Sequence, residues 1–251
     1  MTGNLAASLT PLQWALVGLS GLLIGMNKAG LMGMAMAAIP LMAGIFGAQL
    51  SVGVILPMLI TADVVAVLYY RRHAEWGVVV RLLPWTLIGV GIGVVVGDII
   101  PEESFRMLLA IVVLAGLVLL VYKEVVHRDV NVPEKLWIAA VLGVAAGFAT
   151  MVGNAAGPIM ALYLLSMGMT KNQFIGTGAW FFFIVNVLKV PFHVAVWGTI
   201  TFDTLLVNLY AVPIIVAGGF LGLFLVRFFR ERPYRVFVIG ATALISLRLF
   251  F

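Results

Sequence analysis

Residues 52–70 read VGVILPMLITADVVAVLYY, and Asp63 is the single charged side chain in this run. A helix needs about 20 predominantly apolar residues to cross a bilayer, so the run predicts a membrane-spanning helix. Comparable apolar runs fill most of the remaining chain. They fall at about residues 11–26, 30–46, 78–98, 104–122, 136–152, 156–169, 173–190, 204–226 and 234–251.

The composition supports this interpretation. Hydrophobic residues make up 63% of the 251 residues and charged residues 10%, with a mean hydropathy of +1.17. A soluble domain has about 45–50% apolar and about 25% charged residues, so this chain has too few polar side chains for a water-facing surface. The composition excludes a soluble enzyme, a nucleic-acid-binding domain and a disordered chain. It predicts an all-α, polytopic integral membrane protein with a single membrane domain over residues 1–251.

The two halves of the chain are similar in sequence. A shift of 129 residues places Gly89 on Gly218, and a shift of 127 places Asn27 on Asn154. Because several such matches occur in order at nearly constant offset, we predict two repeats of about five helical segments each. The predicted limits are about 11–122 for repeat one and 136–251 for repeat two, with a connector at 123–135.

Charges in the loops predict how the repeats are oriented. The loop at 71–81 is basic, whereas its counterpart at 192–203 has no Lys or Arg; the loop at 98–103 is acidic, whereas its counterpart at 227–235 is basic. Lys and Arg are retained on the cytoplasmic side, so the repeats should be inverted, with both termini non-cytoplasmic. Each repeat then crosses an odd number of times, as five segments or as three plus a re-entrant hairpin. The predicted cytoplasmic positions are Arg72, Arg128 and Arg230, and the predicted outer positions are Glu102 and Gly198.

The first two segments of each repeat are short, and glycine-containing turns join them at 25–30 (GMNKAG) and 153–158 (GNAAGP). Short, interrupted helices at matching positions of inverted repeats indicate a transporter's binding site. A helix that restarts inside the protein presents free N–H groups with positive partial charge, which favours an anion. The candidate substrate-binding residues are Asn27, Lys28, Gly30, Asn154, Gly157 and Lys189. The alternative is that these are surface turns, with Lys28 and Lys189 reaching to water at the interface.

Asp63 and His193 are candidates for proton coupling. An ionised carboxylate near the bilayer centre costs about 2.5–3.5 kcal/mol, so such residues are usually functional or paired. Asp63 could carry a proton or pair with Lys28; alternatively, it lies near the interface and is neutralised by Arg71 or Arg72. A lone histidine such as His193 is more often structural. The chain has no cysteine, and we find no metal-ligand spacing, nucleophile set or cofactor motif, so no metal and no cofactor is expected.

Several stretches resemble the TauE/SafE sulfite exporter family. They are Gly25–Gly33, Leu56–Asp63, Tyr70–Trp76, Gly147–Pro158, Gly176-Thr177 and Phe182–Pro191. The resemblance covers nearly the whole chain and implies a secondary transporter for sulfite, sulfoacetate or a related sulfonate. Many members have a richer glycine run in the first turn, which Ala29, Leu31 and Met32 interrupt here, and the form with Lys28 resembles one branch of the family.

The combined interpretation is a multi-pass transporter of the bacterial inner membrane that exports a small sulfur-containing anion by alternating access. Its expected partners are the anion and the lipid bilayer, with proton coupling and a homo-oligomer left open and no nucleic acid. A cation/proton exchanger using Asp63 as the ion site is the main alternative. A channel is a further alternative, and an intramembrane enzyme would need a nucleophile or metal set.

Overall fold

The computed structural model describes residues 5–31, 33–126 and 136–225, and all regular secondary structure in these ranges is helical. The elements are α1 (Leu5–Ser8), α2 (Pro11–Lys28), α3 (Met34–Phe46), α4 (Ala48–Tyr70), the short η1 (Arg71–His73), α5 (Trp76–Ile99), α6 (Glu102–Val126), α7 (Leu136–Gly153), α8 (Gly157–Ser166), α9 (Lys171–Ala195) and α10 (Phe202–Leu225). The predicted last segment at 234–251 lies outside the described residues, as do Arg128 and Arg230.

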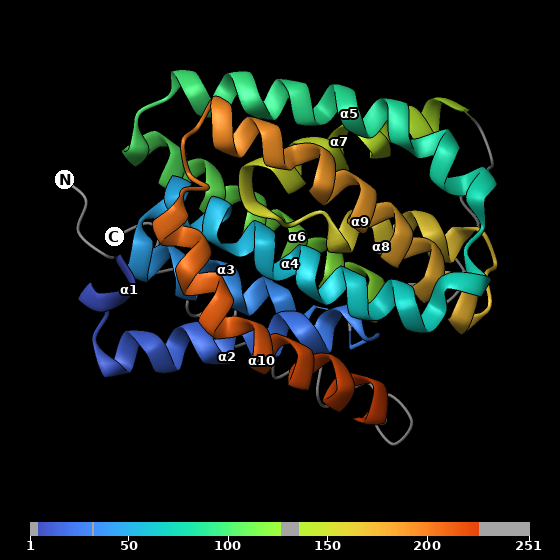
Figure 1. Cartoon of the computed structure of the whole chain (residues 1–251). Helices are drawn as coiled ribbons and strands as arrows, with labels where there is room; N and C mark the ends of the chain where they lie inside the picture. The colour runs from blue at the N-terminus through green and yellow to red at the C-terminus, as the bar shows by residue number, and fades with distance from the viewer. Residues whose placement is uncertain (1–4, 32, 127–135, 226–251) are drawn as a thin grey trace.

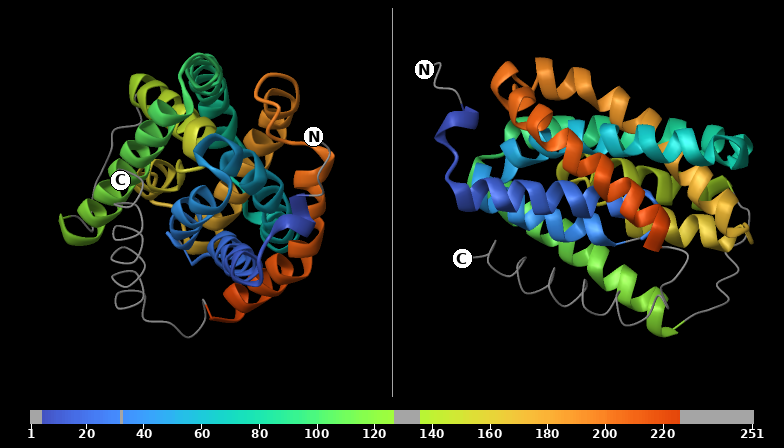
Figure 2. Two further views of the ribbon diagram at one scale, coloured as in Figure 1. Left: turned by 90° about the vertical axis from the view of Figure 1, so that its left-hand side faces the viewer. Right: turned by 60° about the horizontal axis from the view of Figure 1, so that its bottom comes forward.

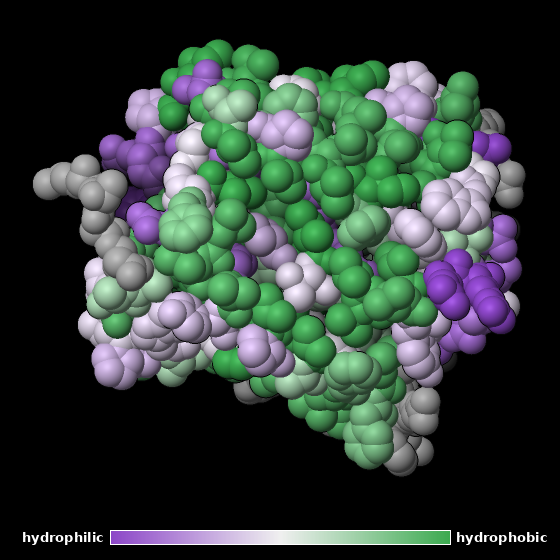
Figure 3. Space-filling model, viewed as in Figure 1, coloured by the Kyte–Doolittle hydropathy of each residue, from purple (hydrophilic) through white to green (hydrophobic). Residues whose placement is uncertain are grey.

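Five described helices are long and apolar enough to cross a membrane: α4 continued by η1, α5, α7, α9 and α10. Hydrophobic side chains cover the middle of the surface, and hydrophilic ones gather toward two opposite ends (Figure 3). Large apolar residues such as Ile92, Leu209 and Phe220 are exposed, as expected for side chains that face lipid rather than water. The prediction of an all-α polytopic membrane protein is confirmed.

The two ends of the bundle differ in charge. At one end, Glu102 Oε1 accepts a hydrogen bond from the Ala48 backbone N–H over 2.6 Å, and Trp197 packs on Phe105. We call this the acidic end. At the other end, which we call the basic end, Arg71–His73 lies beside the first turns of α9, where Gly176 faces the backbone of His73. The predicted outer positions Glu102 and Gly198 therefore share one end, and Arg72 lies at the other.

Helices α4 and α9 lie side by side through the centre of the bundle and run in opposite directions (Figure 1). Gly53, near the start of α4, faces Thr199 beyond the end of α9, whereas Gly176, near the start of α9, faces Tyr70. These helices occupy matching positions in the two predicted repeats. Their antiparallel packing is the arrangement that inversion requires; the sequence limits of the repeats stay a prediction.

Glycine faces bring helices of different repeats into close contact. A Cβ added at Gly89 on α5 would overlap the Val144 carbonyl of α7, and one at Gly218 on α10 would overlap the backbone at Leu22 of α2. Small residues allow such backbone approach within a membrane. The α5–α7 and α2–α10 pairs lie on opposite sides of α4 (Figure 2).

Both short helix pairs turn back inside the bundle. The break between α2 and α3 lies beside Asp63, in the second half of α4, and the break between α7 and α8 lies beside Lys189, in the second half of α9. The pair α2–α3 enters from the acidic end and α7–α8 from the basic end. Of the two arrangements that the sequence left open, these turns favour the re-entrant hairpin; the number of crossings in each repeat stays a prediction.

Candidate functional site

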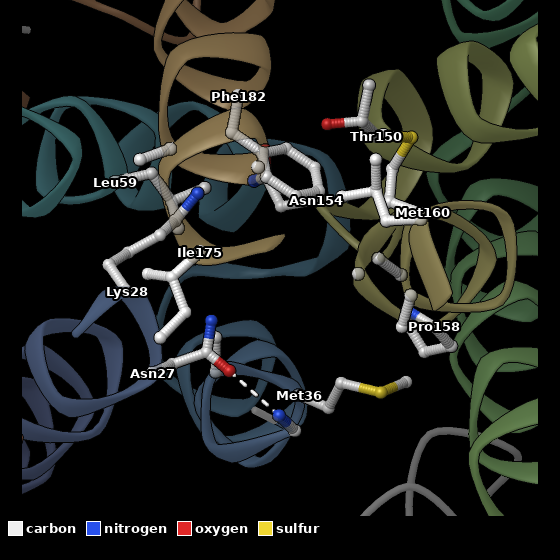
Figure 4. Close-up of a pocket in the computed structure, with 18 of the residues that line it drawn as sticks. Asn27, Lys28, Met36, Leu59, Thr150, Asn154, Pro158, Met160, Ile175 and Phe182 are labelled. Carbon is white, nitrogen blue, oxygen red and sulfur yellow. Dashed lines mark hydrogen bonds between the residues drawn. The ribbon is translucent and has the colours of Figure 1, made fainter. Parts of the chain in front are cut away.

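A cavity of about 90 Å³ lies between the two helix breaks (Figure 4). Its volume suits a small molecule with few non-hydrogen atoms. Residues on four sides line it, drawn from the α2–α3 hairpin, α4, the α7–α8 hairpin and α9. Its lining includes Asn27, Lys28, Gly30, Gly33, Met36, Leu59, Thr150, Asn154, Gly157, Pro158, Met160, Ile175, Phe182 and Asn186.

Lys28 is the charged side chain in the cavity lining, and its ammonium group forms an ion pair with Asp63, which does not line the cavity. Lys28 Nζ lies 2.8 Å from Asp63 Oδ1, and the two side chains are 9% and 0% exposed. Asn186 Nδ2 donates to Asp63 Oδ2 over 2.7 Å. Lys28 Nζ also lies 4.2 Å from the centre of the Phe182 ring, a favourable cation–π distance. Asp63 therefore pairs with Lys28 rather than with Arg71 or Arg72.

Lys189 is completely buried rather than placed at the membrane interface. Its Nζ donates to Thr150 O over 2.8 Å, Thr150 Oγ1 over 3.0 Å and Asn154 Oδ1 over 2.7 Å. Asn154 Nδ2 in turn donates to Val52 O over 3.1 Å, which fixes the orientation of the amide. Lys189 thus stands behind the cavity wall and acts on the cavity through Thr150 and Asn154, which both line it.

The two breaks are built from residues that tolerate unusual backbone angles. Gly30 and Gly33 have φ of 117° and 94°, and Asn154 has φ of 53°. Such positive angles favour glycine and, next, asparagine. Asn27 Oδ1 accepts a hydrogen bond from the Gly33 N–H over 2.9 Å, so this side chain stabilises the loop that leads into α3. The starts of α3 and α8 lie at the cavity, with Gly33 and Gly157 in its wall.

His193 does not reach the cavity. It is buried one helical turn beyond Lys189, with Nδ1 2.8 Å from Thr199 Oγ1 and its ring centre 4.9 Å from that of Trp197. Trp197 Nε1 donates to Val94 O over 3.1 Å. These contacts belong to the acidic end of the bundle, where Trp197 also packs on Phe105.

Sequence analysis missed the α9 face that completes the site. Phe182, Asn186 and Lys189 are spaced by four and three residues, which places them on one side of a helix. This spacing, with Lys189 already a candidate, could have identified Phe182 and Asn186. Thr150 lies one turn before the break at Asn154, but no pattern in the sequence marks it.

The combination of spanning helices, two opposed re-entrant hairpins and a charged cavity at their meeting point defines a membrane transport protein. A sequence model described as "Sulfite exporter TauE/SafE" matches residues 17–249. The chain therefore belongs to the TauE/SafE sulfite exporter family, as its motifs indicated, and this is a family of membrane transporters. No curated protein and no solved structure gave a match.

Proposed function

We propose that this protein is a secondary transporter that binds a small sulfur-containing anion in the cavity between the two helix breaks and exports it. The observation that carries the proposal is that Lys28 lines a small cavity whose wall also includes Gly33 and Gly157, at the N-termini of α3 and α8. A full positive charge and oriented N–H groups together favour an anion.

Each candidate residue has a distinct role in this proposal. Lys28 contacts the anion, and Asn27 shapes the loop that holds it. Asn154 transmits the charge of Lys189 to the cavity wall through their 2.7 Å hydrogen bond. Gly30 and Gly157 leave room for the anion to approach the backbone, because neither has a side chain.

The cavity is asymmetric, and this asymmetry suggests one state of an alternating-access cycle. Toward the basic end, the residues that line the cavity extend as far as Leu164 on α8 and Phe174 on α9. Toward the acidic end, the last α9 residue in the lining is Asn186. Trp197 fills the bundle beyond it. If the basic end is cytoplasmic, as loop charges predict, this state faces inward. Outward opening would then require the Trp197 contacts to separate.

Proteoliposome flux tests the proposal. We expect saturable uptake or exchange of sulfite or a sulfonate by the wild-type protein, and loss of that flux in Lys28→Ala. Lys28→Arg should retain part of it, because the charge is kept while size and hydration change. Lys171→Ala, at the exposed start of α9, is the matched control and should transport normally. Full transport by Lys28→Ala would remove Lys28 from the site.

Asp63 is our candidate proton carrier, whereas the position of His193 associates it with the acidic end. The charged groups that face Asp63 are Lys28 on α2 and, further along α9, Lys189; Asn186 is its neutral partner. Asp63→Asn should weaken the effect of an imposed pH gradient on flux more than it weakens substrate binding. Unchanged pH dependence in this variant would assign Asp63 to structure and favour export driven by membrane potential alone.

A further inference from the structure

Three charged side chains are buried together at the helix breaks in the described part of the chain: Lys28, Asp63 and Lys189. Lys28 and Asp63 form a pair with no net charge. Lys189 has no carboxylate partner among the described residues, since its three hydrogen bonds go to Thr150 and Asn154.

The hydrogen bonds of Lys189 match a protonated amine. An ammonium group has three N–H donors, and Nζ has three oxygen atoms within 2.7–3.0 Å. His193 is buried next to this region, and its Nε2 has no hydrogen-bond partner. A neutral imidazole fits that environment, because a second N–H would be left without an acceptor. With all three side chains ionised, the formal charge around the cavity is +1, from two lysines and one aspartate.

We propose that the cavity selects anions with a single negative charge, and that Asp63 is the residue that sets this selectivity. The inference rests on the proposed function, and it narrows the substrate class to monovalent anions. One negative charge brings the site to neutrality, whereas a dianion leaves an uncompensated charge beside the buried Asp63 and Lys189 side chains. Such a charge is strongly disfavoured in a low-dielectric interior.

The position of Asp63 explains why it can act on the substrate without touching it. Lys28 lines the cavity and Asp63 does not, since Asp63 stands behind Lys28 and holds it with Asn186. An anion at Lys28 therefore experiences the Asp63 charge across the ammonium group. Asp63→Asn preserves the shape and changes the formal charge around the cavity from +1 to +2, which should favour a dianion.

The test compares sulfoacetate, a dianion near neutral pH, with methyl sulfoacetate, which has the same sulfonate group and one negative charge. Taurine, with no net charge, serves as the third probe. Dissociation constants are measured by calorimetry on the purified full chain, and flux is measured in proteoliposomes. The wild-type protein should bind the ester at least about tenfold more tightly than sulfoacetate, and Asp63→Asn should reverse the order by a similar factor. Asp98→Asn, at an exposed position of the acidic end, should keep the wild-type order.

Equal or tighter binding of sulfoacetate by the wild-type protein would overturn the inference, as would an unchanged preference in Asp63→Asn. If Asp63→Asn does not fold, Lys189→Met is the second variant, because it lowers the formal charge around the cavity from +1 to 0 and leaves Lys28 and Asp63 in place. It should weaken binding of the ester relative to taurine; an unchanged ratio would contradict us. Failure of the proposed function gives a different result, because then no sulfonate and no sulfite would bind or be transported by the wild-type protein.

Discussion

The buried Lys28–Asp63 pair predicts a strongly non-additive response to mutation. Asp63 is 0% exposed and lies 2.8 Å from Lys28 Nζ, so Lys28→Met leaves a carboxylate in the interior without its cation. Removing one partner of a buried pair costs about 3–5 kcal/mol of unfolding free energy. Asp63→Asn should cost less, about 1–3 kcal/mol, because Lys28 keeps the Phe182 ring and access to the cavity.

The double variant Lys28→Met/Asp63→Asn removes both charges and keeps nearly the same volume. Its unfolding free energy should be within about 1 kcal/mol of the wild-type value, since apolar replacement of a buried ion pair is often neutral or stabilising. The assay is thermal unfolding in detergent at mildly alkaline pH. At this pH the unpaired Asp63 carboxylate of Lys28→Met is protonated least, so the loss of stability is largest. For a chain of this size, Lys28→Met should lower the transition temperature by roughly 6–20 °C.

The same variants separate structure from transport. The double variant should fold like the wild-type protein and still fail to transport a sulfur anion, because the charge that faces the cavity is gone. Additive destabilisation, with the double variant as unstable as the sum of the singles, would refute the ion-pair reasoning. Transport by the double variant would refute the role of Lys28.

Three further predictions concern packing, topology and the acidic end. Gly89→Ala should lower the unfolding free energy by about 1–3 kcal/mol because its Cβ meets α7, whereas Gly91→Ala on the same helix meets nothing and should be neutral in thermal unfolding. Cysteines introduced at Arg72 and Glu102 should label from opposite sides of the membrane in intact cells; labelling from the same side would contradict the arrangement of the ends. Trp197→Ala removes contacts with Phe105 and His193 and should raise substrate-independent anion leak in proteoliposomes. An unchanged anion leak in this variant would mean that Trp197 contributes to stability alone.

Local sequence identified the two helix breaks, because positive φ angles and interrupted apolar runs are properties of a few neighbouring residues. Asn27 and Asn154 align at a shift of 127 residues, and both lie beside breaks in the structure. The sequence did not show that the side-chain amides of Asn27 and Asn154 have different hydrogen-bond partners. Asn27 stabilises its own loop, whereas Asn154 bridges Lys189 and Val52, which lie far away in the chain.

The sequence by itself determined that this protein is a bundle of apolar helices with polar breaks, because bilayer thickness fixes helix length and lipid excludes exposed polar backbone. Only the tertiary structure decided which charges meet. Asp63 could pair with Lys28 or with Arg71, and Lys189 could lie at the interface or in the interior, until α2, α4, α7 and α9 were packed together. The depth of a re-entrant hairpin and the partners of a buried lysine depend on contacts between residues distant in the chain. The hydropathy of a single segment does not contain this information.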